Sequence, residues 1–256
     1  MASRTAMVTG AAGGIGAAVA QALGADGVTV AAVDCDAAKL RATVDRLTGL
    51  GLRVEGFPGD VSHRSSVESV VDAAERRLGP LEALVNAAGV LRVGKVTRFA
   101  PEDWATIFSV NATGVFNMCQ AVATRMITRS RGAIVTVASN AARVPRAEMA
   151  AYAASKAAAA MFTKSLGLEV ARHGIRCNVV APGSTDTPML RSMWHDDSGA
   201  DSTIDGRLDA FRVGIPLGRL ATPKDISEAV AFLLSDRAAH ITLHELTIDG
   251  GAALGV

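Results

Sequence analysis

The sequence of 256 residues is poor in several residue types, and each shortage excludes a class of protein. Its 26 basic and 25 acidic residues leave a formal net charge of +1, and no basic run offers a surface for nucleic acid. No stretch of about 20 uncharged apolar residues is present that would span a membrane. The sequence therefore predicts no nucleic acid and no membrane among its partners. Its 49% hydrophobic content suits a single domain with a sizeable core.

Cysteine and histidine are also scarce, and this bears on location and on metals. The three cysteines, Cys35, Cys119 and Cys177, are odd in number and far apart, which indicates free thiols in a reducing compartment. The opening residues lack the long apolar run of a secretion signal, so we expect a cytoplasmic protein. Among the histidines only His240 and His244 have a metal-ligand spacing, and they flank an apparent strand, so we predict no metal site.

Aromatic residues make up 4% of the chain, and Tyr152 is the only tyrosine, so any tyrosine chemistry must use it. A β-rich apolar run from Gly132 to Ser139 precedes it and predicts a buried strand. An alanine-rich stretch from about Ala150 to Arg172 contains it and favours a long helix. Lys156 lies four positions after Tyr152 and therefore on the same helix face.

This geometry suggests how Tyr152 could act as a base. A free phenol has a pKa of about 10, but an ammonium ~4 Å away, at an effective dielectric of ~20, contributes about 4 kcal/mol and could lower that pKa by up to about three. Burial of the phenolate opposes this effect. A phenol lowered in this way could take a proton from an alcohol whose oxygen Ser139 holds. The alternative is a core tyrosine beside an ordinary surface lysine.

The first strand-to-helix turn predicts a dinucleotide site. A short apolar strand, Thr5–Thr9, leads into a glycine-rich turn, residues 10–16, and then into a helical pattern that ends near Ala25. Glycines there let the backbone approach a pyrophosphate, whose charge the helix N-terminus favours. The next strand, Val28–Val33, ends on Asp34, where an acid would bind the adenosine ribose hydroxyls and repel a 2′-phosphate. We therefore predict NAD rather than NADP, although Asp34 could instead cap the following helix.

The rest of the chain continues the alternation of strands and helices. Further strands are expected at 53–57, 81–85, 132–139, 174–181 and 245–248. Helices are expected from a Ser62 cap to Arg77 and at about 101–129, about 150–172 and 223–234. This order predicts an α/β doubly wound Rossmann fold, with a seven-stranded parallel sheet and helices on both faces. One domain is expected over residues 1–256, with a polar segment at about 188–214 predicted to be a substrate lid with one or two short helices.

Seven motifs, spread over the whole chain, resemble those of the short-chain dehydrogenase/reductase family. They are Thr9-Gly10-x-x-x-Gly14-x-Gly16, Asp60-Val61, Asn86-Ala-Ala-Gly89, Asn111, Ser139, Tyr152-x-x-x-Lys156 and Pro182-Gly183-x-x-x-Thr187. The resemblance implies a homotetramer in which Ser139, Tyr152 and Lys156 are catalytic and Asn111 supports a proton relay through Lys156. It also implies these cofactor contacts: Gly10, Gly14, Ile15, Gly16, Asp34, Asp60, Val61, Asn86, Ala87, Gly89, Tyr152, Lys156, Pro182, Gly183, Thr185 and Thr187. Ala87 departs from the asparagine that the family often has there.

Segments that vary across the family resemble its members that oxidise dihydrodiol carboxylates. These segments are Gly89–Arg92, Val144–Tyr152, Pro182–Thr187 with Met189 and Trp194, and the tail from Asp249. The similarity implies NAD-dependent oxidation of 2,3-dihydro-2,3-dihydroxybenzoate, a cyclohexadiene carboxylate, to 2,3-dihydroxybenzoate for catechol siderophores. The substrate carboxylate needs a cation, and the planar fork of arginine suits it. The predicted substrate contacts are Arg146, Arg92 and Arg191, in that order of preference for the carboxylate, with Asn140, Met149, Met189 and Trp194.

Three alternatives remain open at this point. The substrate could be the 2-amino analogue, 2,3-dihydro-3-hydroxyanthranilate, giving 3-hydroxyanthranilate, and Asn140 next to Ser139 is the residue placed to decide. A ketoreductase that uses NADPH is disfavoured by Asp34. A nucleotide-sensing protein without turnover is disfavoured by the intact set of candidate catalytic residues.

Overall fold

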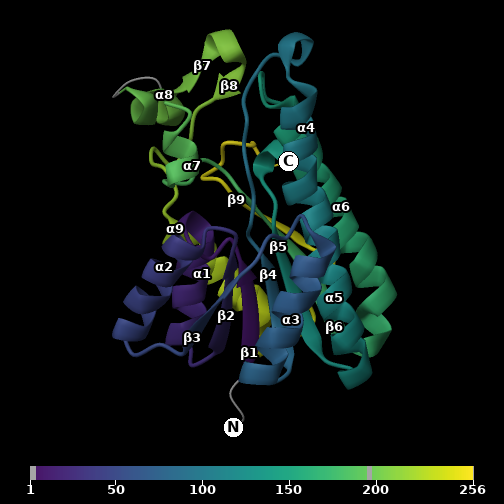
Figure 1. Ribbon diagram of the computed structural model, residues 1–256. Helices are drawn as coiled ribbons and strands as arrows, with labels where there is room; N and C mark the ends of the chain where they lie inside the picture. The colour runs from purple at the N-terminus through teal and green to yellow at the C-terminus, as the bar shows by residue number, and fades with distance from the viewer. Residues whose placement is uncertain (1–3, 195–197, 256) are drawn as a thin grey trace.

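Seven strands form the central parallel sheet within residues 4–194 and 198–255, which the computed structural model describes (Figure 1). The strands are β1 (Thr5–Thr9), β2 (Thr29–Asp34), β3 (Val54–Pro58), β4 (Leu81–Asn86), β5 (Gly132–Val137), β6 (Ile175–Pro182) and β9 (Glu245–Ile248). They lie in the order β3-β2-β1-β4-β5-β6-β9. Successive strands are added on one side of β1 up to β3 and on its other side from β4 onward, so the strand order reverses between β1 and β4. The predicted doubly wound sheet is confirmed, and its reversal point is where such sheets bind ligands.

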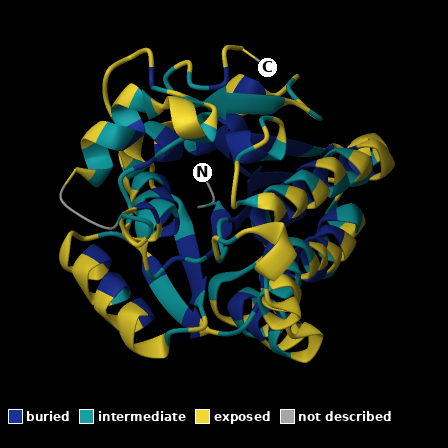
Figure 2. Ribbon diagram, turned by 90° about the horizontal axis from the view of Figure 1, so that it is seen from above, coloured by how far each residue is buried: buried dark blue, intermediate teal, exposed yellow. Residues whose placement is uncertain are grey.

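Helices cover both faces of the sheet, as predicted. The long helices are α1 (Gly14–Ala25), α2 (Ala37–Gly49), α3 (Arg64–Leu78), α4 (Pro101–Phe108), α5 (Gly114–Arg129), α6 (Ala150–Val170) and α9 (Pro223–Leu234). α1, α2 and α9 share one core, which includes Val19 and Leu40, and α3, α5 and α6 share the other, which includes Val71 and Met118. Figure 2 shows that the outer helices bury one side and expose the other, because their apolar residues recur at helical spacing.

The predicted helix from about 101 to 129 is interrupted at Asn111. α4 ends at Phe108, and a π-helical turn, Ser109–Thr113, precedes α5. The carboxamide of Asn111 bonds to the backbone of Val90 in both directions, since Nδ2 donates to the carbonyl at 2.9 Å and Oδ1 accepts from N–H at 2.8 Å. These bonds tie the helix to the loop after β4. A π turn of this kind is often found at functional sites.

The segment predicted to be a lid stands above the carboxyl ends of the strands, where Figure 1 labels α7, α8, β7 and β8. These elements are α7 (Pro188–Arg191), α8 (Gly199–Asp205) and a two-stranded antiparallel ladder of β7 (Gly206–Arg207) and β8 (Arg212–Val213). The segment thus contains two short helices and, in addition, a small hairpin that the sequence did not predict. Residues 195–197 of this segment lie outside the described part of the chain.

Most element boundaries agree with the sequence prediction to within a residue or two. α9 and β9 have the predicted bounds. α3 begins at Arg64 with His63 in the cap position, so the expectation that Ser62 caps this helix is wrong; the Ser62 hydroxyl is instead bonded to the Asp60 carboxylate at 2.7 Å. None of the described helices is both long and apolar enough to cross a bilayer.

Candidate active site

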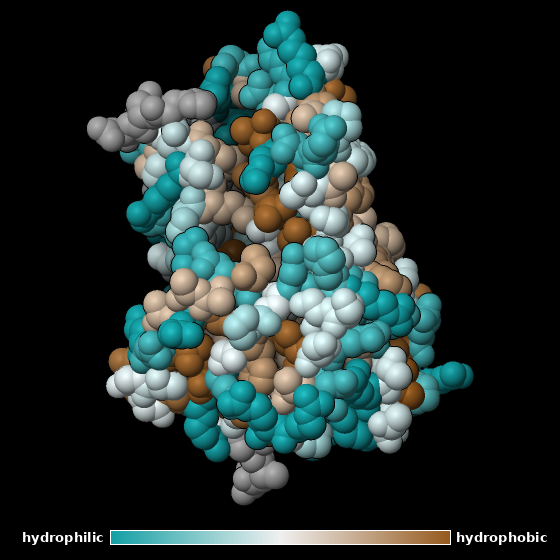
Figure 3. Space-filling view, viewed as in Figure 1, coloured by the Kyte–Doolittle hydropathy of each residue, from teal (hydrophilic) through white to brown (hydrophobic). Residues whose placement is uncertain are grey.

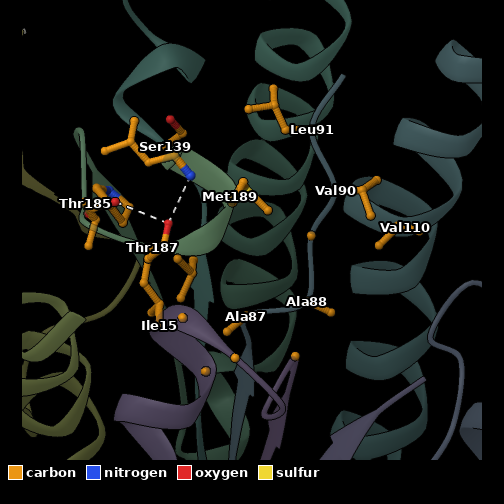
Figure 4. Close-up of a pocket in the computed structure, with 18 of the residues that line it drawn as sticks. Ile15, Ala87, Ala88, Val90, Leu91, Val110, Ser139, Thr185, Thr187 and Met189 are labelled. Atoms are coloured by element: carbon orange, nitrogen blue, oxygen red, sulfur yellow. Dashed lines mark hydrogen bonds between the residues drawn. The ribbon is translucent and has the colours of Figure 1, made fainter. Parts of the chain in front are cut away.

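A cavity of about 670 Å³ opens at the carboxyl ends of β1, β2, β4, β5 and β6, next to the reversal in strand order. Figure 3 shows a hollow in this side of the molecule, with hydrophobic residues inside it. Figure 4 shows Ile15, Thr185 and Thr187 at one side of the cavity and Val90 and Val110 at the other. The cavity therefore runs from the glycine-rich turn to the segment of α7 and the small hairpin.

The glycine-rich turn fits the pyrophosphate of a dinucleotide. Gly10 has a φ of +67°, which favours glycine, and a Cβ on Gly16 would lie 2.1 Å from the Gly10 carbonyl oxygen. α1 begins after Gly13, which has no side chain to cap it, so N–H groups of the first turn are available at the cavity. Gly10, Gly14, Ile15 and Gly16 line the cavity, as the sequence predicted for cofactor contacts.

Asp34 orients this turn and also faces the cavity. Its carboxylate accepts hydrogen bonds from Ala12 N–H and Asp36 N–H, both at 3.0 Å. The cap of α2 is Asp36, which accepts from Lys39 N–H, so the alternative use of Asp34 as that cap is excluded. Lys39 also lines the cavity, but its ammonium lies 2.9 Å from the Asp36 carboxylate. Lys39, a cation beside Asp34, is therefore paired with Asp36.

The next strand ends supply the walls beyond the turn. Asp60 and Val61 line the cavity, and the Asp60 carboxylate accepts from Ser62 N–H at 2.8 Å. Burial raises the pKa of Asp60, but hydrogen bonds from Ser62 and the charge of His63 outweigh burial, so the net effect is a lowered pKa. This carboxylate is therefore ionised at neutral pH.

After β4 the chain passes beneath the cavity. Ala87 and Gly89 line it, whereas the predicted contact Asn86 does not, because its amide points into the core toward Cys119 Sγ and Thr136 Oγ1, each at 3.2 Å. A side chain at Gly89 would meet Lys156, since a Cβ there would lie 3.2 Å from Nζ. Small residues in this stretch thus leave the floor of the cavity open.

The opposite wall comes from β6 and the residues after it. Pro182, Gly183, Thr185 and Thr187 line the cavity, as predicted. Thr187 Oγ1 donates to the Thr185 carbonyl at 3.2 Å and accepts from Leu190 N–H at 3.3 Å (Figure 4). These bonds make Thr187 the N-cap of α7 and connect the cofactor end of the cavity to the segment above it.

Ser139, Tyr152 and Lys156 come together at the middle of the cavity. All three line it and are at most 9% exposed. Ser139 follows β5, and Tyr152 and Lys156 lie one turn apart at the start of α6, as the four-residue spacing predicted. The Lys156 ammonium donates to the Val137 carbonyl at 2.9 Å and lies 5.8 Å from the centroid of the Tyr152 ring.

The expected lowering of the Tyr152 pKa by Lys156 is wrong for the protein without its cofactor. Burial raises the pKa of the Tyr152 phenol to about 12, and the hydrogen bond with Ser139 only partly offsets this. Burial also lowers the pKa of Lys156 to about 8. The physical reason is that both groups are shielded from water, so the loss of hydration outweighs their mutual effect.

Asn111 lies beside this set rather than in it. Its carboxamide is occupied by the Val90 backbone and by Ser155, to whose Oγ Nδ2 donates at 3.0 Å. The side chain is fully buried and does not line the cavity. The structure thus shows Asn111 as a helix-distorting side chain bonded to backbone, and its support of a proton relay stays a prediction. It positions α6 through Ser155, next to Lys156.

The predicted substrate contacts divide into two groups. Asn140, Arg146, Met149 and Met189 line the cavity. Asn140 Nδ2 donates to Asp249 Oδ2 at 3.0 Å. Because a carboxylate can only accept, this bond directs the amide nitrogen of Asn140 to Asp249 and leaves its oxygen free for another donor.

Arg92, Arg191 and Trp194 form the second group and do not line the cavity. Arg92 lies 3.7 Å from the Asp103 carboxylate, and Arg191 forms a two-pronged pair with Asp186 at 2.7 and 2.9 Å. Sequence reasoning could not separate these arginines from Arg146, because all three were expected in loops beyond strand ends.

Sequence reasoning also missed residues that the structure brings to this end of the cavity. They are Val90, Leu91, Val110, Leu190, Met193 and Arg212. All but Arg212 are apolar and suit the faces of a ring. Arg212 belongs to β8, and its only signal in the sequence was its place in the predicted lid segment.

The fold and the site together define a class of protein, a doubly wound oxidoreductase with a nicotinamide cofactor and a serine, tyrosine and lysine at its centre. The family profile described as short chain dehydrogenase matches residues 4–198. The chain belongs to this family, and the resemblance seen in its motifs is confirmed. It is accordingly an enzyme that acts on CH–OH groups.

Individual members of the family are similar to this chain over most of its length. The chain is 52% identical over 253 residues to 2,3-dihydro-2,3-dihydroxybenzoate dehydrogenase of Bacillus subtilis (strain 168), covering 99% of this chain and 97% of that protein. It is 46% identical to the protein of the same name in Escherichia coli (strain K12), over 77% of this chain and 79% of that one. A gluconate 5-dehydrogenase from Burkholderia cenocepacia J2315, solved with NADP and tartrate, superposes with a TM-score of 0.90 at 32% identity, covering 99% of this chain and 96% of that one.

Proposed function

We propose that the protein oxidises a ring alcohol of 2,3-dihydro-2,3-dihydroxybenzoate with NAD, giving 2,3-dihydroxybenzoate for siderophore biosynthesis. The names of the two relatives at 52% and 46% identity support this substrate. The observation in the structure that carries it is Arg146, a cation that lines the cavity on the loop between the serine and the tyrosine. An aromatic precursor with a carboxylate fits a cavity that offers one cationic end and apolar walls.

NAD is the cofactor that the Asp34 end of the cavity favours. A 2′-phosphate would meet the carboxylates of Asp34 and Asp36, and the nearby Lys39 is paired with Asp36. The predicted preference for NAD over NADP therefore rests on the repulsion between these carboxylates and a phosphate on the 2′ oxygen of the ribose. The same residues would hold the adenosine ribose.

In the proposed mechanism Tyr152 takes the proton of the substrate hydroxyl and Ser139 holds its oxygen. Lys156 binds the ribose next to the nicotinamide and adds positive charge beside the phenol. A bound nicotinamide would supply the acceptor for the hydride that leaves the carbon bearing this hydroxyl. Because burial holds the pKa of Tyr152 at about 12 even with Lys156 beside it, the phenol needs further positive charge, which a bound oxidised nicotinamide ring would supply, before it can act as a base near neutral pH.

The 2-amino analogue, 2,3-dihydro-3-hydroxyanthranilate, is the second candidate substrate. The free oxygen of the Asn140 carboxamide would accept a hydrogen bond from either a hydroxyl or an amino group. This contact therefore accepts both substrates, and an assay of each separates them.

The test is NADH formation at 340 nm with the dihydrodiol acid and with its 2-amino analogue, each with NAD and NADP. We expect the highest kcat/KM with the dihydrodiol and NAD. Preference for the 2-amino analogue would mean that the product is an aminobenzoate, and preference for NADP would contradict the role of Asp34. Absence of turnover with both acids would refute the proposed substrate class.

We also propose a homotetramer in the cytoplasm. Met161 and Leu168 of α6 are 62% and 69% exposed, which supports packing of this alanine-rich helix against a second copy. All three cysteines are free thiols, in keeping with a reducing compartment. Light scattering after size-exclusion chromatography tests the tetramer, and a monomer at micromolar concentration would refute it.

A further inference from the structure

Two arginines reach the same end of the cavity from different segments. Arg146 lies on the loop between β5 and α6, four residues before α6 begins at Ala150. Arg212 lies in β8 of the small hairpin. Both line the cavity together with Met149 and Met193. The cation that the proposed substrate needs is thus present twice.

Neither guanidinium has a hydrogen-bonding or ion-pair partner within residues 4–194 and 198–255. Other arginines of the same region do have partners, since Arg191 pairs with Asp186 and Arg207 pairs with Asp209. An arginine has five N–H donors, and at the wall of a cavity those donors are open to water or to a ligand with acceptor oxygens. Unlike Arg191 and Arg207, the two arginines therefore keep their N–H donors available to a ligand in the cavity.

Their charges also disfavour each other. Burial lowers the pKa of Arg146, and the charge of Arg212 lowers it further, while Asp249 acts weakly in the opposite direction. Burial and the charge of Arg207 lower the pKa of Arg212. Asp249 forms no ion pair with Arg146 among the described residues; its two oxygens accept hydrogen bonds from Gly251 N–H and Asn140 Nδ2. An anion between the two guanidiniums would relieve this repulsion.

We propose that Arg146 and Arg212 bind the substrate carboxylate together, one from the catalytic loop and one from the hairpin. The proposal rests on the proposed function for its ligand class, an aromatic or cyclohexadiene monocarboxylate. A carboxylate has two oxygens, each of which accepts two hydrogen bonds, so it can serve two guanidinium forks at once. Arg212 thereby becomes a determinant of specificity, and the carboxylate links the hairpin to the body of the enzyme.

The experiment compares Arg212→Gln, Arg146→Gln and the double variant with the wild-type enzyme, and uses Arg207→Gln as the matched control. Arg207 lies on the same hairpin, is exposed, is paired with Asp209 and does not line the cavity. The substrates are the dihydrodiol acid and its uncharged primary carboxamide, with NAD. Unchanged NAD affinity of each variant verifies that it is folded.

We expect each single variant to lower kcat/KM for the acid by about 10- to 100-fold, mainly through KM, because a charge-assisted hydrogen-bonded contact is lost. The carboxamide should be turned over equally by all variants, and Arg207→Gln should behave as wild type. Arg212→Lys should recover part of the lost activity, since it restores the charge without the fork. An Arg212→Gln enzyme within about threefold of wild type on the acid, or an equal loss on acid and carboxamide, would overturn the proposal.

A second measurement separates this proposal from the proposed function. Calorimetric titration of benzoate and of benzamide into the enzyme saturated with NADH requires no turnover. Benzoate should bind to wild type and Arg207→Gln and bind at least about tenfold more weakly to Arg212→Gln, whereas benzamide should not distinguish them. If the wild type turns over neither acid but benzoate follows this pattern, the substrate is wrong and the carboxylate site stands. If benzoate binds wild type and Arg212→Gln equally, the site is wrong whatever the substrate.

Discussion

The buried charge of Lys156 is expected to lower the free energy of unfolding of the cofactor-free protein. Lys156 is 5% exposed, and burial lowers its pKa from 10.5 to about 8. At about 1.36 kcal/mol per pH unit, this fall corresponds to about 3 kcal/mol of cost for carrying the charge in the folded protein. The bond from its ammonium to the Val137 carbonyl recovers about 1 to 2 kcal/mol. Replacement of Lys156 by methionine, which has a similar length and no charge, should therefore stabilise the cofactor-free protein by about 1 to 2 kcal/mol at pH 7.

The sign of this effect depends on pH. Below pH 8 both the folded and the unfolded lysine are charged, so the folded state bears the full cost. Between about 8 and 10.5 the folded lysine loses its proton while the unfolded one keeps it, and the wild type gains stability relative to Lys156→Met. By about pH 10 the order should be reversed, because the neutral amine still bonds to Val137. The raised pKa of Tyr152 is present in both proteins and cancels in the difference.

The assay is thermal unfolding of the wild type and Lys156→Met without cofactor, at pH 7 and near pH 10 and at equal protein concentration. At pH 7 the variant should unfold about 2 to 8 °C higher, on the scale expected for a chain of this size, and should be inactive. Lys39→Met is the control, since Lys39 is exposed and its bond with Asp36 raises its pKa, so that variant should not be stabilised at pH 7. A destabilised Lys156→Met at pH 7, or a stability difference that is the same at both pH values, would refute the reasoning.

Three further predictions follow from the site. Tyr152→Phe should fold normally and bind NAD, but lose about 10²- to 10⁴-fold in kcat, and retention of more than about a tenth of the activity would remove the tyrosine as base. Asp34→Ala should raise the KM for NAD about tenfold, because it removes both the ribose acceptor and the bond to Ala12 N–H. It should also lower the ratio of kcat/KM with NAD to kcat/KM with NADP, and an unchanged ratio would contradict the role of Asp34. Asp249→Asn should lower kcat/KM for the dihydrodiol about tenfold with NAD affinity unchanged. An amide at 249 can donate as well as accept, so the Asn140 carboxamide could exchange the positions of its oxygen and nitrogen. An unaffected kcat/KM would show that the orientation of Asn140 does not matter.

Local sequence was sufficient for the elements and for the parts of the site that lie close along the chain. Strands and helices follow from apolar periodicity and from glycine-rich turns, which is why α9 and β9 were placed with their final bounds. Tyr152 and Lys156 could be paired because four residues make one helical turn. The glycine turn and Asp34 could be joined because parallel strands present their carboxyl ends at one edge of the sheet.

The tertiary structure decided the properties that depend on contacts between distant segments. The pKa of Tyr152 is raised, not lowered, because burial comes from the packing of the whole domain. Asn86 and Asn111 are held in the interior by Thr136 and Ser155, which are 50 and 44 residues away, so no local pattern could show that they leave the cavity wall. Arg146 and Arg212 line one cavity only because the tertiary structure brings the hairpin and the loop before α6 to it, whereas Arg191 is paired with Asp186, five residues away. The sequence by itself therefore determined the fold, the family and the central chemistry, and the packing of distant segments decided which side chains remain free to meet the substrate.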